Sequence, residues 1–151
     1  MNERAGDSAD SPPQRAERVR AAMYERDYAG QALGIEVAEI APGSAAATMT
    51  VRRDMLNGFA MCHGGLIVTL ADTAFAYACN SYDEMTLAAG LDAEFLKGAR
   101  LGDALRAEAR EQSQAGRLGV YDVSVRNQHG ELVALLRGRS YRLRGKPVTG
   151  G

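Results

Sequence analysis

The chain has few of the features that mark a secreted, membrane or nucleic-acid-binding protein. Its 151 residues include only two cysteines, Cys62 and Cys79, which lie too far apart for a C-x-x-C motif, so we predict reduced thiols and a cytoplasmic location. A formal net charge of −1 gives no reason to expect nucleic acid or an acidic membrane as a partner. The polar N-terminus lacks the apolar segment of a secretory signal, and Asp72 interrupts the longest apolar run, so no membrane span is expected.

The length and the 46% content of hydrophobic residues predict one globular domain. Residues 1–13 are rich in Ser, Asp and Pro and have almost nothing to bury. We therefore expect a disordered tail over residues 1–13, a domain over residues 14–144 and a loose tail over residues 145–151. Charged residues with apolar residues at helical spacing predict an amphipathic helix from residue 14 to about residue 30.

The hydrophobic periodicity predicts strands on both sides of one buried helix. Residues 33–40 and 45–52 have strand character around a Pro42-Gly43-Ser44 turn, and residues 64–80 are apolar on nearly every face of a helix. From residue 85, apolar and polar residues alternate in four runs, and turns at residues 114–116 and 128–130 indicate an antiparallel meander. This order predicts an α+β fold in which an antiparallel sheet wraps around one long central helix, the hotdog architecture.

The residues with the most chemical potential lie between Asn57 and Asp72. Asn57 begins a turn-prone segment, His63 and the Gly64-Gly65 pair stand at the predicted helix start, and Asp72 lies in the middle of the apolar helix. Backbone N–H groups at a helix start suit a developing negative charge, and a carboxylate offers a base or a nucleophile. Each residue also has a structural interpretation: a hydrogen-bonded core Asp, a helix-capping His, closely packed glycines and an ordinary turn at Asn57.

These residues resemble the motif of the hotdog-fold acyl-CoA thioesterases, most closely the phenylacetic acid degradation type. The similarity covers about residues 33–143 and rests on the spacing of Asn57, His63-Gly64-Gly65 and Leu70-Ala71-Asp72, with further likeness at residues 73–76, 94–97 and 102–103. It implies hydrolysis of (hydroxy)phenylacetyl-CoA or a related aryl or medium-chain acyl-CoA to the free acid and CoA, with no metal or redox cofactor.

The resemblance also implies roles for the matching residues. Asp72 would activate the hydrolytic water or attack the thioester carbonyl, and Asn57 would help to position that water. The backbone N–H of Gly64 would hold the thioester oxygen, with His63 beside it. Gly65 and Thr73 are expected to contact the substrate.

Helix geometry adds a constraint of its own. An α-helix rises about 1.5 Å per residue, so Gly64 and Asp72 are about 12 Å apart, whereas a base must come within about 3 Å of its proton or act through one water. Two antiparallel helices related by a two-fold axis would bring Asp72 of one chain to Gly64 of another. We therefore expect a homodimer that forms the active site. A homotetramer of two such dimers is a separate expectation, which helix geometry does not supply. A non-catalytic acyl-CoA-binding hotdog protein and a hotdog acyl-thioester dehydratase or hydratase are the alternatives.

Overall fold

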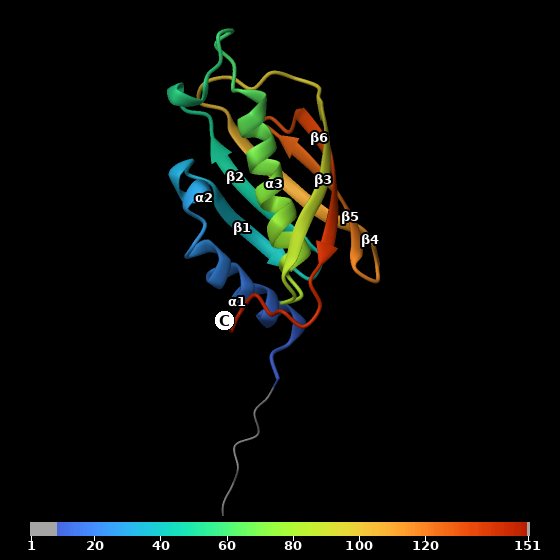
Figure 1. Cartoon of the computed structure of the whole chain (residues 1–151). Coiled ribbons are helices and arrows are strands. Elements are labelled where there is room, and N and C mark those ends of the chain that lie inside the picture. Colours follow the sequence, from blue (N-terminus) through green and yellow to red (C-terminus); the bar gives the residue numbers. More distant parts are fainter. Residues whose placement is uncertain (1–8, 151) are drawn as a thin grey trace, which may run out of the picture.

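In the computed structural model, which describes residues 9–150, a six-stranded antiparallel sheet wraps around one long helix (Figure 1). The predicted α+β architecture is confirmed. The elements follow in the order α1 (Pro12–Tyr24), α2 (Tyr28–Ala32), β1 (Glu36–Ala41), β2 (Ser44–Thr50), the 3₁₀-helix η1 (Arg53–Met55), α3 (Gly64–Asn80), β3 (Thr86–Phe95), β4 (Ala104–Ala115), β5 (Leu118–Arg126) and β6 (Leu132–Arg142).

The central helix α3 has the bounds that the sequence predicts, and it is the main contributor to the core. Leu70, Ala74 and Phe75 are fully buried on it. The ring centroid of Phe75 lies 5.4 Å from that of Tyr121 on β5, with the two rings tilted by 56° to each other. A Cβ added to Gly138 on β6 would lie only 2.8 Å from the Phe75 ring, so a glycine is needed where this ring meets the sheet. Apolar residues around the whole helix thus correspond to burial on most of its faces.

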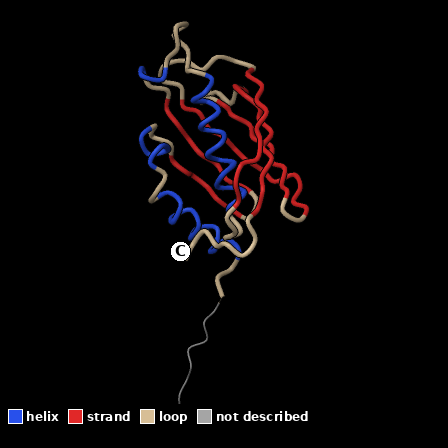
Figure 2. Tube along the Cα trace, viewed as in Figure 1, coloured by secondary structure: helices blue, strands red, loops and turns tan. Residues whose placement is uncertain are grey.

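The strand order across the sheet is β1-β2-β4-β5-β6-β3. The predicted meander is confirmed for β4, β5 and β6, which pair in succession. Strand β3 instead pairs with β6 at the far edge, so its connection to β4 runs across one end of the sheet. In Figure 2 the loops before α3 and after β3 gather at that end, near the start of the helix. The amide of Cys62 donates to the carbonyl of Ala99 at 2.8 Å and ties the two loops together.

The N-terminal region differs from the prediction of one helix over residues 14–30. Two helices form instead, because Asp27 breaks the run and caps α2, accepting a hydrogen bond from the Gly30 amide at 3.0 Å. The same carboxylate accepts from the Tyr77 hydroxyl of α3 at 3.1 Å. Ser11 caps α1 and the two prolines that follow it begin that helix, so the predicted disordered tail is wrong for residues 12 and 13. Residues 1–8 of the predicted tail lie outside the residues that the structure describes.

The predicted loose tail after residue 144 is also held in place over the part that the structure describes. The amides of Val148 and Thr149 donate to Oδ1 of Asp83 at 2.9 and 2.8 Å, and the Thr149 hydroxyl donates to Oδ2 at 2.6 Å. Arg18 of α1 pairs with the same carboxylate at 3.4 Å. Asp83 therefore connects both the C-terminal residues and helix α1 to the loop after α3. Among the described helices, none is long and apolar enough to cross a membrane.

Candidate active site

Helix α3 begins with a histidine cap. His63 is exposed, and its Nδ1 accepts a hydrogen bond from the Gly65 amide at 3.0 Å. This bond satisfies one of the N–H groups that the first turn of a helix leaves without an acceptor. The structure thus gives His63 a capping contact at the helix start, and the Gly65 N–H is already used.

The amide of Gly64, by contrast, has no hydrogen-bond acceptor among residues 9–150. Gly64 lies on the wall of a cavity of about 310 Å³. An unpaired N–H at a helix start carries the positive end of the helix dipole, so this wall offers a donor to an anionic or carbonyl oxygen. The other lining residues are Asn57, Met61, Cys62, Ile67, Phe95, Leu96, Lys97 and Gly98.

Asn57 lies on the same cavity wall, and its own loop holds its orientation. Its Oδ1 accepts from the amides of Phe59 and Met61 at 2.9 and 3.2 Å. The Nδ2 group has no acceptor among the described residues and remains free to donate. Asn57 is therefore both a turn residue and a second donor beside Gly64.

Asp72 is half-buried, two turns into α3, and has no hydrogen bond or ion pair with any described residue. Burial raises the pKa of its carboxyl group above the ordinary value, because the surroundings disfavour the charged form. An unpaired, partly buried carboxylate reduces stability, so its presence points to a functional role. Within residues 9–150, no group of three His, Cys, Asp or Glu side chains is placed to hold a metal ion.

Thr73 follows Asp72 and is also half-buried. Its hydroxyl donates to the carbonyl of Thr69 at 2.8 Å, one turn earlier in the helix. The hydroxyl proton is thus used by the helix, and only the oxygen lone pairs are left for a ligand.

The structure brings some of the predicted site residues together and leaves others apart. Asn57 and Gly64 share the cavity and His63 stands beside them, whereas Asp72 and Thr73 do not line it within one chain. Sequence reasoning missed Phe95 as a lining residue. Residues 94–97 stood out through their likeness to a family, which signalled the segment without a role for Phe95.

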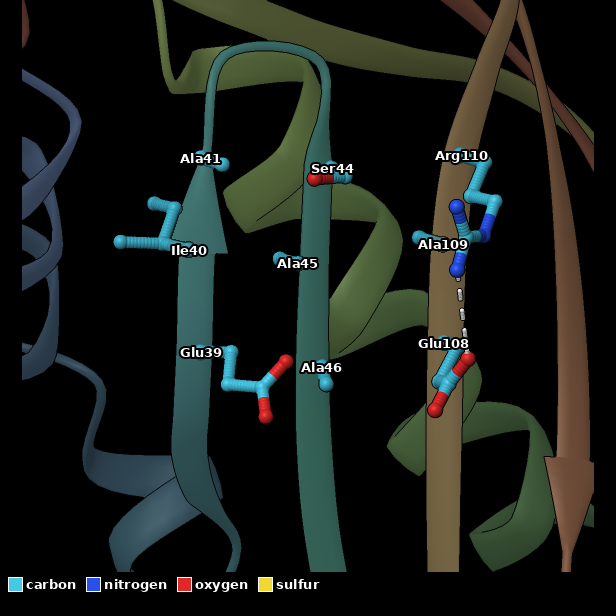
Figure 3. A pocket seen from close by; sticks show the side chains of 9 residues that line it. All are labelled: Glu39, Ile40, Ala41, Ser44, Ala45, Ala46, Glu108, Ala109 and Arg110. Atoms are coloured by element: carbon cyan, nitrogen blue, oxygen red, sulfur yellow. Dashed lines mark ion pairs between the residues drawn. The ribbon is translucent and has the colours of Figure 1, made fainter. Parts of the chain in front are cut away.

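A second hollow, of about 340 Å³, lies over β1, β2 and β4 (Figure 3). Glu39, Ala46 and Glu108 form a row across the three strands. Arg106 pairs with Glu39 at 3.1 Å and with Glu108 at 3.0 Å, and Arg110 lies 3.8 Å from Glu108. Since both carboxylates already have cationic partners, neither is available as an unpaired base. The cavity at the start of α3 is the better candidate site.

This chain is similar to known thioesterases. The model of the thioesterase superfamily matches residues 59–134, which include the start of α3 and Asp72. Acyl-coenzyme A thioesterase PaaI of Escherichia coli is 46% identical over 129 residues, which are 85% of this chain and 91% of that protein.

Solved structures give the same result. The PaaI protein from the phenylacetic acid degradation operon of E. coli superposes with a TM-score of 0.88 and 44% identity, over 90% of this chain and 99% of that one. A variant of the phenylacetic acid degradation protein PaaI from Thermus thermophilus superposes with a TM-score of 0.75 and 35% sequence identity, over 78% of this chain and 100% of that one. A Streptococcus mutans protein bound to acetyl CoA superposes with a TM-score of 0.70 and 26% sequence identity, over 72% of this chain and 88% of that one.

Proposed function

Because this chain belongs to the thioesterase superfamily and is a thioester hydrolase, we propose that its substrates are acyl-CoA thioesters, which it cleaves to the free acid and CoA. The name of the E. coli relative and the acetyl CoA in the S. mutans structure support CoA as the thiol component. Two relatives are named for phenylacetic acid degradation, which favours phenylacetyl, hydroxyphenylacetyl or a related aryl group, with medium aliphatic chains as the next choice.

The observation that carries this proposal is the free N–H of Gly64 at the start of α3, a residue that lines the same cavity as Asn57. The thioester oxygen accepts from this N–H, which stabilises the negative charge that develops as the carbonyl is attacked. A preorganised donor of this kind typically contributes about 3–4 kcal/mol to transition-state stabilisation. The free Nδ2 of Asn57 positions the attacking water or the same oxygen.

Asp72 acts as the general base. Its carboxylate takes a proton from water, the water oxygen bonds to the thioester carbon, and the tetrahedral intermediate then expels CoA thiolate, which regains the proton. Because burial raises its pKa, this carboxylate is a stronger base than an exposed aspartate. In the alternative route Asp72 attacks the carbonyl itself, releases CoA and leaves a mixed anhydride that water hydrolyses.

The remaining predicted residues have supporting roles in this proposal. His63 holds the first turn of α3 through its bond to the Gly65 amide. Gly65 contacts the substrate through its bare Cα, since its N–H is occupied. Thr73 contacts it through its hydroxyl oxygen.

A dimer completes the site. Gly64 and Asp72 stand eight residues apart on one unbroken helix, about 12 Å along its axis, so one chain does not bring them together. An antiparallel pair of α3 helices places Asp72 of one chain beside Gly64 of the other, twice per dimer. Strand β3 lies at a sheet edge and is free to extend the sheet into a second chain. We place this dimer within a cytoplasmic homotetramer.

The test is release of free thiol from a panel of phenylacetyl-, hydroxyphenylacetyl-, benzoyl-, hexanoyl- and decanoyl-CoA, with Asp72→Asn as the matched control. We expect release that falls by about 10²–10⁴-fold in the variant. Binding without turnover would indicate a non-catalytic acyl-CoA-binding protein. Hydration of an enoyl-CoA without release of thiol would indicate a hydratase. Either result would refute the proposed function.

A further inference from the structure

The start of α3 is in unusually close contact with a side chain from the sheet. A Cβ atom added to Gly64 would lie 3.1 Å from Cζ of Phe95 and 3.3 and 3.5 Å from its two Cε atoms. The tip of the Phe95 ring therefore occupies the space beside Gly64. Residue 64 provides the free N–H, and Phe95 lines the same cavity.

This contact explains why residue 64 is a glycine. Gly64 is the first residue of a regular helix and is not among the glycines with positive φ, so its backbone conformation is open to any residue. An alanine would keep the same N–H and favour the helix. The ring of Phe95 would have to shift by a few tenths of an ångström to admit a side chain at this position.

Phe95 has a hydrogen-bonded backbone on its C-terminal side and a largely exposed side chain. It is the last residue of β3, and the next two amides, of Leu96 and Lys97, both donate to the carbonyl of Val133, at 2.9 and 3.2 Å. The side chain of Lys97 pairs with Glu131. The residue is nevertheless 54% exposed, far more than a core phenylalanine. A fixed backbone that holds an exposed aromatic ring against a helix start is hard to explain by core packing alone.

We infer that Phe95 is a positioning residue for the thioester: its ring forms the wall that confines the carbonyl group to the free N–H of Gly64. This inference rests on the proposed thioesterase function and deepens it. The ring excludes water from one side of the donor and limits where the carbonyl can lie. The ring acts on the thioester group common to all substrates, so its effect is the same for aryl and aliphatic acyl chains.

A double-mutant cycle of Gly64→Ala and Phe95→Ala tests the inference. We expect Phe95→Ala to lower kcat by about tenfold to a hundredfold, with a smaller change in KM, because misplacement of the reacting group affects the transition state most. Gly64→Ala should lower kcat when Phe95 is present, because the ring must move aside. In the Phe95→Ala background it should have almost no further effect. Phe95→Leu, which keeps an apolar wall, should recover much of the activity.

Phe59→Ala is the matched control, since Phe59 is 82% exposed in the neighbouring loop and does not line the cavity. It should leave kcat unchanged. Independent, multiplicative effects of the two main substitutions would overturn the inference. So would a Phe95→Ala defect confined to aryl substrates, which would make Phe95 part of an acyl pocket.

The dissociation constant of a non-hydrolysable ketone analogue of phenylacetyl-CoA, in which a methylene group replaces the thioester sulfur and the carbonyl is kept, separates this inference from the proposed function when it is measured for the same variants. If the wild-type protein releases no thiol, the proposed function fails, and the coupling energy of the double-mutant cycle is then calculated from these dissociation constants. Coupling between residues 64 and 95 in ligand binding would then support the inferred role of the Phe95 ring. Absence of coupling would overturn that role. If the wild-type protein is active and the cycle shows no coupling, only the inference fails.

Discussion

Mixing two inactive variants should restore activity if the catalytic site is shared between chains. Asp72→Asn removes the base and keeps the donor, and Gly64→Pro removes the donor and keeps the base. Proline is tolerated at the first position of a helix, and His63 before it has ψ of 130°, a conformation that suits the residue preceding proline. The Phe95 ring must give by a few tenths of an ångström to admit the proline Cβ.

The size of the recovery follows from the separation of the two residues on α3. Gly64 and Asp72 are about 12 Å apart on one helix, so each site takes its donor from one chain and its base from the other. With equal amounts of the two variants and random assembly, about one site in four combines an intact Asp72 with an intact Gly64. This fraction is the same for a dimer and for a tetramer made of two such dimers.

The assay is thiol release after co-expression, or after joint unfolding and refolding, with each variant treated alone as the control. Each variant alone should retain less than about 1% of the wild-type kcat, because loss of a donor lowers kcat by about 10²–10³-fold and loss of a base by about 10²–10⁴-fold. Recovery to about 25% of the wild-type value is therefore far above background. Mixed assemblies that stay at the background level would refute the shared site.

Four further predictions concern the same helix and its packing. The ratio kcat/KM should rise with pH as Asp72 ionises, at a pH above the ordinary carboxyl range because burial raises its pKa, and a pH–rate profile of Asp72→Asn should lack this limb. The raised pKa means that ionised Asp72 destabilises the folded state. The free energy of unfolding should therefore fall as the pH rises from the ordinary carboxyl pKa through the raised pKa of Asp72. Calorimetry should show Asp72→Asn to be more stable at pH 7, by a margin that disappears below the ordinary value of 3.8; an equal margin at all pH values would contradict this. His63→Ala should lower the free energy of unfolding by about 1 kcal/mol and His63→Asn should restore most of it in denaturant titrations, because Asn also caps helices; equal losses would argue against a cap. Gly138→Ala should cost about 1–3 kcal/mol in thermal unfolding, because its Cβ would lie 2.8 Å from the Phe75 ring, and an unchanged melting temperature would show that the ring can move.

The parts of the fold that depend on local pattern could be predicted. The bounds of α3 follow from a capping residue, two glycines and an apolar run of helical length. The strands follow from alternating residues between turn signals, although their ends shift by up to a few residues. The helix over residues 14–30 was predicted wrongly, because the capping bond of Asp27 and its contact with Tyr77 outweigh helical spacing there.

The candidate site could be predicted only in part. Asn57, Gly64 and Asp72 have the residue types and spacing that indicate their chemistry. That the Gly65 N–H is used by His63, and that the Thr73 hydroxyl is used by Thr69, depends on side-chain orientation and became evident only in the structure.

The sequence by itself determined which segments become helix and strand and which residues offer a donor and a base, because these properties depend on neighbours within a few positions. The tertiary structure alone decided that β3 crosses to pair with β6, which brings Phe95 against Gly64. It also decided that Asp83 holds the C-terminal residues. These contacts join residues far apart in the chain, and they form only when the sheet closes around α3, which no local pattern specifies.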